Sequence, residues 1–146
     1  MATVVIDANI GLALVVNLAY STRVQTQLMA WRSQNTEIVV PALWWYEMVS
    51  GLRQAVSAGI LPAQDAIAAL DDLTALNLKT VAATPLLLRR ALYWAEQLKQ
   101  TVAYDAQYLA LAEHLKADFW TADTRLVKAA RAKAIEFVRA LQESSE

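Results

Sequence analysis

Short apolar runs rich in β-branched residues alternate along the chain with longer segments in which apolar positions recur every three or four residues. Such runs are typical of buried strands, and the longer spacing is typical of helices packed on a core. Strands are predicted at residues 3–6, 37–40, 78–81, 118–121 and 135–138. Helices are predicted at residues 10–17, 21–31, 42–58, 62–76, 85–100, 103–117 and 124–134. This alternation predicts an α/β protein whose parallel sheet is covered by helices on both faces.

Residues typical of helix starts support these boundaries. Ser21 and Thr84 are predicted N-caps, because their hydroxyls can accept from the first free backbone N–H groups. Pro41, Pro62 and Pro85 suit the first helical turn, where a missing N–H costs nothing. Residues 142–146 are predicted to be a frayed end, and residues 1–146 a single domain.

The composition excludes several classes of function. The chain has no cysteine, which excludes disulfides, thiolate metal sites and cysteine nucleophiles. Its single histidine, His114, excludes a histidine acid–base pair and a three-histidine zinc site within one chain. The N-terminus has no basic segment before its apolar run, and no apolar stretch approaches the ~20 residues of a membrane span. We expect a cytoplasmic protein with no membrane partner.

The formal net charge of −1 bears on nucleic-acid binding. Proteins that bind nucleic acid through surface charge alone are usually strongly basic. Any nucleic-acid activity must therefore depend on a local site. The remaining chemically active side chains are mostly carboxylates, which favour hard cations such as Mg²⁺ or Mn²⁺.

Four carboxylates occur in apolar surroundings: Asp7, Glu47, Asp105 and Asp123. Asp7 and Asp123 come just after predicted strands, where open parallel sheets bind their ligands. A buried carboxylate without a partner is costly, and two unit charges ~4 Å apart repel by roughly 4 kcal/mol at an effective dielectric of 20. A divalent cation among the four acids would remove both costs.

Each acid also has a simpler interpretation. Asp7 and Asp123 could be helix N-caps, and Asp105 could favour the first turn of its helix. Glu47 could pair with Arg53 or Arg125. The metal-site interpretation depends on the four acids taken together.

Four segments of the chain resemble the PIN-domain family, and in particular its VapC-like toxins. They are VIDAN at 5–9, WYEMVSGL at 45–52, YDAQYLALA at 104–112 and TADTRL at 121–126. The order and spacing of these segments match the family pattern from residue 4 to about residue 138.

The resemblance implies a three-layer α/β/α fold and a Mg²⁺- or Mn²⁺-dependent endoribonuclease that leaves a 5′-phosphate. The four acids of the family pattern correspond to Asp7, Glu47, Asp105 and Asp123, which are the implied catalytic and metal-binding residues. Thr121 corresponds to the polar residue two positions before the last acid, and Asn9 to a position that is often polar; both are candidate supporting residues. The resemblance also implies a homodimer and a cognate antitoxin whose tail covers the acidic groove, as the toxin of a toxin–antitoxin pair.

Two further features bear on RNA and protein partners. Residues 124–135 contain no acid but contain Arg125, Lys128, Arg131 and Lys133, so this helix could contact the phosphate backbone or could be a solvated face. The consecutive aromatic residues at 44–46 point about 100° apart on a helix, so they cannot all face one core. One of them is expected either in a subunit or partner interface or in packing on another side of the helix.

Two other functions remain open from the sequence. Asp7 is well placed for an aspartyl-nucleophile phosphotransferase, although position 9 is Asn where haloacid-dehalogenase-like enzymes carry a second Asp. The chain could also be a non-catalytic PIN-fold module that binds a protein partner through its pocket. Metal binding and RNA cleavage discriminate between these functions and the nuclease.

Overall fold

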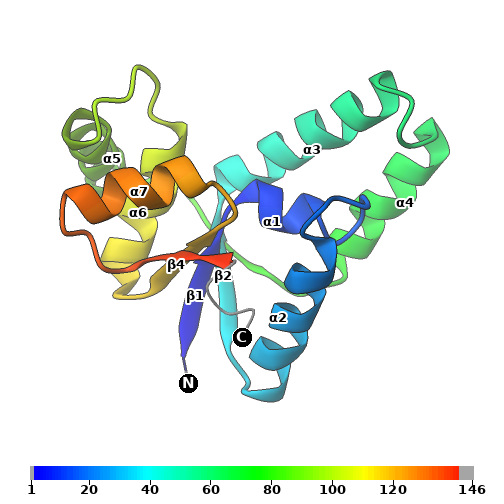
Figure 1. Cartoon of the computed structure of the whole chain (residues 1–146), viewed down its shortest axis with the longest axis horizontal. Helices are drawn as coiled ribbons and strands as arrows, with labels where there is room; N and C mark the ends of the chain where they lie inside the picture. The colour runs from blue at the N-terminus through cyan, green and yellow to red at the C-terminus, as the bar shows by residue number, and fades with distance from the viewer. Residues whose placement is uncertain (1, 142–146) are drawn as a thin grey trace.

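A computed structural model describes residues 2–141, and its centre is an all-parallel sheet (Figure 1). The strands lie in the order β3-β2-β1-β4-β5. Their bounds are Thr3–Ile6 for β1, Glu37–Pro41 for β2, Lys79–Val81 for β3, Asp118–Thr121 for β4 and Val138–Ala140 for β5. The middle strands are apolar and buried, as expected for a parallel sheet with both faces covered.

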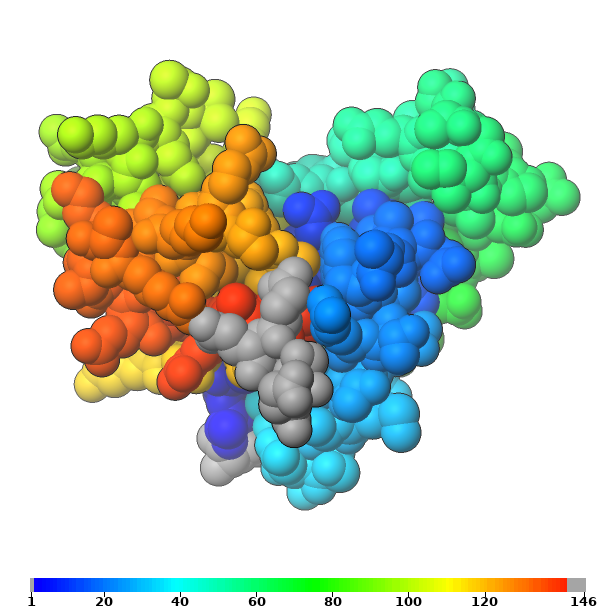
Figure 2. Space-filling view, viewed as in Figure 1, coloured from blue at the N-terminus to red at the C-terminus, as the bar shows by residue number. Residues whose placement is uncertain are grey.

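Helices flank the sheet and complete the three-layer α/β/α architecture predicted from the sequence. Their bounds are Ala8–Leu12 for α1, Ser21–Ser33 for α2, Ala42–Ser57 for α3, Ala63–Thr74 for α4, Pro85–Gln97 for α5, Tyr104–Leu115 for α6 and Thr124–Ala132 for α7. Helix α6 packs against β1, β2 and β4, and α5 packs on α6. Helices α3 and α4 extend away from the sheet on the opposite side from α5–α7 (Figure 1). Figure 2 shows the surface hollowed between these two groups of helices.

The core joins the sheet to α6. Val5, Val39 and Phe119 are at most 1% exposed on the central strands, and Leu109 of α6 is fully buried. Burial of each such side chain contributes roughly 1.5–3 kcal/mol. The strand ends that carry the predicted acids are therefore held by the best-packed part of the molecule.

Several predicted boundaries are wrong in detail. The first helix covers Ala8–Leu12 and not residues 10–17, because the chain turns after Leu12. Ser21 lies inside α2; its hydroxyl donates to the Val16 carbonyl and accepts from the Leu18 N–H, so it stabilises the preceding loop. Pro41 and Pro62 occupy N-cap positions and not the first turn. Thr84 and Pro85 are the predicted cap and first-turn proline.

The last strand lies at Val138–Ala140 and not at residues 135–138. Ile135 is buried within the turn before the strand, so its apolar character reflects packing and not sheet pairing. The predicted frayed end at 142–146 lies outside the described residues. Within residues 2–141, no helix is long and apolar enough to cross a membrane.

Candidate active site

The ends of β1 and β4 lie side by side at the point where the strand order changes direction. From β1, the sheet continues through β2 and β3 on one side and through β4 and β5 on the other. Such a switch point leaves a crevice beyond the carboxyl ends of the strands, which is where open α/β sheets bind ligands. Asp7 directly follows β1, and Asp123 follows β4 by two residues.

Asp7 is held by three contacts. Its Oδ1 accepts from the Ile10 N–H at 3.1 Å, so Asp7 is the N-cap of α1. This is the simpler of the two roles predicted for Asp7 from the sequence. Its Oδ2 accepts from the Thr121 hydroxyl at 2.5 Å. The Trp44 Nε1–H donates to the Asp7 backbone carbonyl at 3.0 Å. The side chain is thus fixed between α1 and β4, the backbone of Asp7 is tied to α3, and Asp7 is only 7% exposed.

Burial raises the pKa of Asp7 from 3.8 to about 7. The hydrogen bonds from Thr121 and Ile10 oppose this rise, whereas the charges of Asp105 and Glu47 add to it. A carboxyl group that titrates near neutral pH inside a pocket is typical of functional sites.

Glu47 extends from α3 toward the same pocket. Its Oε1 accepts from the Tyr108 hydroxyl at 2.6 Å, and Tyr108 is on α6. This donor is Tyr108 and neither Arg53 nor Arg125, the two partners that the sequence suggested for Glu47. Burial is the main reason that the pKa of Glu47 is raised. The charge of Asp105 adds to this rise, and the hydrogen bond from Tyr108 opposes it.

Asp105 lies in the first turn of α6. Burial and the charge of Asp123 raise its pKa, and a side-chain hydrogen bond with Gln100 lowers it. The Gln100 Oε1 atom is buried without a hydrogen-bond partner. Because the mutual effects of these charges fall off with distance, they indicate that Asp105 lies close to Glu47, Asp7 and Asp123.

Asp123 is the N-cap of α7, which was the simpler interpretation of this residue. Its Oδ1 accepts from the Arg125 and Leu126 N–H groups at 3.0 and 3.3 Å. Its own backbone N–H donates to the Thr121 hydroxyl oxygen at 3.0 Å. Thr121, which is fully buried, therefore links Asp7 to Asp123, and its role as a supporting residue of the site remains a prediction.

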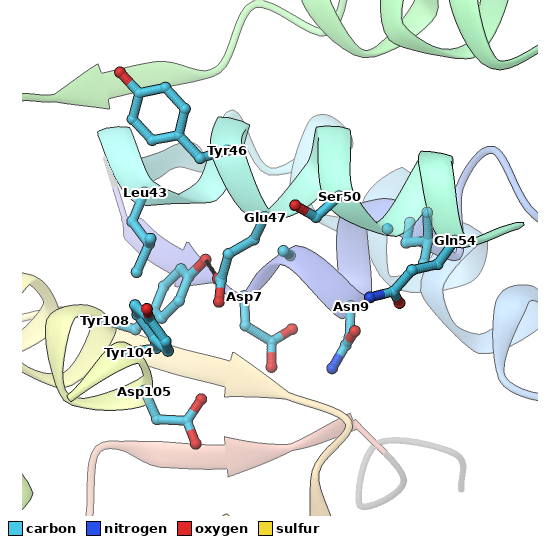
Figure 3. A pocket seen from close by; sticks show the side chains of 13 residues that line it. Asp7, Asn9, Leu43, Tyr46, Glu47, Ser50, Gln54, Tyr104, Asp105 and Tyr108 are labelled. Atoms are coloured by element: carbon cyan, nitrogen blue, oxygen red, sulfur yellow. Dashed lines mark hydrogen bonds between the residues drawn. The ribbon is translucent and has the colours of Figure 1, made fainter. Parts of the chain in front are cut away.

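An open pocket of about 470 Å³ brings three of the four acids together (Figure 3). Asp7, Glu47 and Asp105 line it, whereas Asp123 does not. Asn9, the other predicted supporting residue, lies at one end of the pocket with Ser50 and Gln54. Leu43, Tyr46, Tyr104 and Tyr108 lie toward the other end, so the acids are between an amide-rich side and an aromatic side.

The donors to the pocket acids are all uncharged. In residues 2–141, Asp7, Glu47 and Asp105 accept hydrogen bonds from the Ile10 N–H, from the Thr121 and Tyr108 hydroxyls and from the Gln100 amide. The ion pairs Arg90–Glu113 and Arg139–Asp118 use other carboxylates. Within the same residues, no three acidic or histidine side chains are arranged to hold a metal ion. Among the described residues that line the pocket there is no lysine, arginine or histidine, and the predicted metal ligation remains a prediction.

The predicted RNA-binding residues lie on the solvent side of α7. Arg125, Lys128 and Arg131 are exposed, and Leu126, Val127 and Ala130 form the buried face of the same helix. Because Asp123 caps this helix, its basic face begins beside the last predicted acid. Their role in RNA binding remains a prediction.

The aromatic residues at 44–46 point in different directions, as helical geometry requires. Trp44 is fully buried, Trp45 donates to the Thr80 hydroxyl at 2.9 Å, and Tyr46 is 72% exposed at the edge of the pocket.

Two residues of the site were not identified from the sequence. Tyr108 lies three positions after Asp105 on α6, and this spacing places both side chains on one helix face. The spacing from Asp105 could therefore have identified Tyr108 as a residue of the site. Gln100 is outside every motif, and only the folded chain brings it to Asp105.

A parallel sheet flanked by helices, with carboxylates gathered beyond its switch point, defines an α/β protein with an acidic pocket at the ligand-binding end of the sheet. The family model for the PIN domain matches residues 4–132, and the chain belongs to the PIN-domain family. Members of this family are nucleases that generally use a divalent metal ion. The family predicted from the sequence is confirmed. No curated protein matches the chain.

Solved structures share the fold at low sequence identity. One is PAE2754 from Pyrobaculum aerophilum, with a TM-score of 0.70 and 19% identity, covering 97% of this chain and 85% of that chain. A second is a toxin–antitoxin complex from Klebsiella pneumoniae, with a TM-score of 0.67 and 17% identity, covering 94% of this chain and 97% of that chain. A third is the sarcin-ricin loop cleaving toxin VapC20 from Mycobacterium tuberculosis, with a TM-score of 0.60 and 14% identity, covering 82% of this chain and 87% of that chain.

Proposed function

We propose that this PIN-domain protein is an endoribonuclease that hydrolyses RNA phosphodiester bonds with Mg²⁺ or Mn²⁺, and that it is the toxin of a toxin–antitoxin pair. The observation that carries the proposal is the meeting of Asp7, Glu47 and Asp105 in one pocket at the switch point of the sheet. The family membership and the fold shared with an RNA-cleaving toxin support it.

The chemical nature of these donors suits a hard divalent cation. Carboxylate oxygens are the ligands that Mg²⁺ and Mn²⁺ prefer. The pocket acids raise one another's pKa, and the side chains that donate hydrogen bonds to them are neutral, so a cation would relieve their repulsion. Asp7, Asp105 and Asp123 would be the main ligands, and Glu47 would bind directly or through water. When bound, the metal would acidify water and stabilise charge on the scissile phosphate.

The side chains of the chain itself position the reaction. Thr121 and Ile10 fix both oxygens of Asp7, and Tyr108 fixes one oxygen of Glu47, so the acids need little reorganisation when substrate arrives. In the proposed hydrolysis, a water oxygen attacks phosphorus and the ribose 3′-oxygen leaves with a proton. The products carry a 5′-phosphate and a 3′-hydroxyl. The ribose 2′-hydroxyl is not consumed.

Exposed apolar side chains support the proposed protein partners. Helices α3 and α4 and the loop between them expose Tyr46, Val49, Ile60 and Ile67. Helix α5 exposes Leu86, Leu88, Leu92 and Tyr93. Grouped apolar residues on a surface mark interfaces more often than isolated ones do. We propose that a second copy of the chain and a cognate antitoxin cover these faces, with the antitoxin reaching the acidic pocket.

The decisive experiment compares Asp7→Asn with the wild type on RNA in Mn²⁺. We expect loss of cleavage in the variant with an unchanged far-ultraviolet circular dichroism spectrum. Asp72→Asn, which removes an exposed acid of α4, is the matched control and should cleave normally. End-group analysis should find 5′-phosphates on the products.

Other outcomes would favour the other functions. Full cleavage by Asp7→Asn would refute the assignment of the site. Absence of both cleavage and Mn²⁺-induced thermal stabilisation in the wild type would favour a non-catalytic binding module. A stable phospho-aspartate at Asp7 would favour a phosphotransferase, although both Asp7 oxygens already accept hydrogen bonds.

A further inference from the structure

Tyr108 makes a contact that the family pattern of acids does not explain. Its hydroxyl donates to the Glu47 Oε1 at 2.6 Å across the pocket between α6 and α3 (Figure 3). The Tyr108 side chain is 1% exposed. A buried phenol hydroxyl is costly without a hydrogen-bond partner, and Glu47 is the acceptor for this one.

The packing of Tyr108 does not depend on its hydroxyl. Its ring stacks on Phe119 of β4, with the ring centroids 5.4 Å apart and the planes at 6°. Phenylalanine would fill the same space and keep the same stacking. The hydroxyl is therefore not needed for packing, and what it contributes is the hydrogen bond to Glu47.

The direction of this bond is fixed by its partners. A carboxylate oxygen can only accept, so the single proton of the Tyr108 hydroxyl points to Glu47. This bond uses one lone pair of the Glu47 Oε1 and fixes the orientation of the carboxylate, so Oε2 is the oxygen better placed to bind a ligand in the pocket.

We propose that Tyr108 is a positioning residue that holds the Glu47 carboxylate so that it presents one oxygen, Oε2, to the metal site. This inference rests on the proposed nuclease function. A neutral hydroxyl suits this role, because it fixes the carboxylate without adding a positive charge. An arginine or lysine at the same place would neutralise Glu47 and weaken its attraction for a cation.

The test is the Tyr108→Phe variant, which removes one oxygen atom and keeps the ring. Mn²⁺ affinity is measured by electron paramagnetic resonance without RNA, and kcat and KM are measured on an RNA substrate. We expect Mn²⁺ binding to weaken about 10- to 100-fold, as for other partners of metal ligands, with a fall in kcat and a KM within about two-fold of the wild type. Thr26→Val, which removes an exposed hydroxyl on α2 outside the pocket, should match the wild type.

A double-mutant cycle with Glu47→Gln tests whether Tyr108 acts through Glu47. If it does, adding Tyr108→Phe to Glu47→Gln should cause no further loss of Mn²⁺ affinity. Additive losses would overturn the inference. So would a Tyr108→Phe protein that binds Mn²⁺ and cleaves RNA like the wild type.

One measurement does not require the Tyr108→Phe variant to fold. In wild-type protein labelled with 3-fluorotyrosine, Mg²⁺ should shift the ¹⁹F resonance of Tyr108, and Glu47→Gln should abolish that shift. An unshifted resonance at saturating Mg²⁺ would overturn the inference. If the wild type neither binds Mn²⁺ nor cleaves RNA, the proposed function fails and the inference fails with it. If the wild type does both and only the Tyr108 results disagree, the inference alone fails.

Discussion

The Thr121 hydroxyl donates to the Asp7 Oδ2 at 2.5 Å and so joins the end of β4 to the end of β1. The same hydroxyl oxygen accepts from the Asp123 N–H at 3.0 Å. One small neutral side chain therefore sets the spacing between the first and the last predicted acid. Since Thr121 is fully buried, water does not compete for these two bonds.

Thr121→Val removes this link while keeping the shape of the side chain. We expect the free energy of unfolding to fall by about 1–3 kcal/mol at pH 8, because ionised Asp7 and the Asp123 N–H both lose a buried partner. The loss should be smaller at pH 5, where Asp7 is protonated. Urea denaturation at both pH values measures this difference. Thr3→Val, a similar change on β1, is the control, and an equal effect of Thr121→Val at both pH values would contradict the prediction.

The raised pKa of Asp7 makes the metal-free protein sensitive to pH. A carboxyl whose pKa is higher in the folded state than its ordinary value of 3.8 favours folding while it is protonated. That contribution is lost as the pH rises from 3.8 through about 7, and its upper limit is on the order of 4 kcal/mol. Burial raises the pKa values of Glu47 and Asp105 as well, which acts in the same direction.

Asp7→Asn should therefore stabilise the metal-free protein above pH 7 and have much less effect at pH 5. The neutral amide does not ionise in the buried site, so it avoids the cost that the wild type incurs as the pH rises. Urea denaturation in EDTA from pH 5 to pH 8.5 measures the two curves. A wild type that gains stability over Asp7→Asn as the pH rises would contradict the sign of the Asp7 shift.

Mn²⁺ should reverse this behaviour in the wild type. A ligand that binds only the folded state stabilises it by about 2.7 kcal/mol at one hundred times its dissociation constant. The increase in melting temperature should be larger at pH 8 than at pH 5.5, because protons compete with the ion for the carboxylates. Asp7→Asn should show little increase at either pH. Equal stabilisation of the wild type and the variant would place the ion elsewhere.

The fold was predictable from the sequence where local pattern and tertiary packing agree. Strands β1 and β4 are short apolar segments followed closely by acids, and both were predicted with their observed bounds. The end of α7 was harder to place, because Ala134 takes a left-handed backbone conformation (φ 58°) without the glycine or asparagine that usually marks one. Ile135 is then buried in a turn, and its apolar character resembles the start of a strand.

The candidate site, like the fold, could be predicted from the sequence only in part. The acids could be selected from the sequence because carboxylates in apolar segments are unusual. Their neutral partners could not, because Tyr108 is 61 positions from Glu47 and Thr121 is 114 positions from Asp7. Thr121 was found through the family pattern, whereas nothing in the sequence alone joins Gln100 to Asp105.

Asp123 has an observed role as a helix cap and a proposed role as a metal ligand, and substitutions can separate the two. As the N-cap of α7 it is replaceable by Asn, which is an equally good cap, so Asp123→Asn should change stability by only a few tenths of a kcal/mol. Asp123→Ala should cost about 1 kcal/mol. If Asp123 is also a metal ligand, both variants should lose cleavage to a similar extent. Full cleavage by Asp123→Asn would leave the cap as its only role.

The exposed basic face of α7 makes a prediction about salt. Each phosphate contact by a lysine or arginine contributes about −0.7 to −0.9 to the slope of log binding constant against log salt concentration. Replacing Lys128 and Arg131 by Ala should weaken RNA binding and reduce that slope by about one to two, and Arg125→Ala should add to both effects. Binding is measured in the Asp7→Asn background, so that cleavage does not interfere.

Lys79→Ala is the matched control for this measurement, because Lys79 is an exposed lysine at the start of β3 and does not line the acidic pocket. It should leave both the affinity and the salt slope unchanged. If the α7 substitutions behave like Lys79→Ala, the helix presents a solvated face and RNA approaches the acids from another direction. If they reduce the slope and Lys79→Ala does not, the phosphate backbone crosses α7 beside Asp123, since that residue caps the same helix.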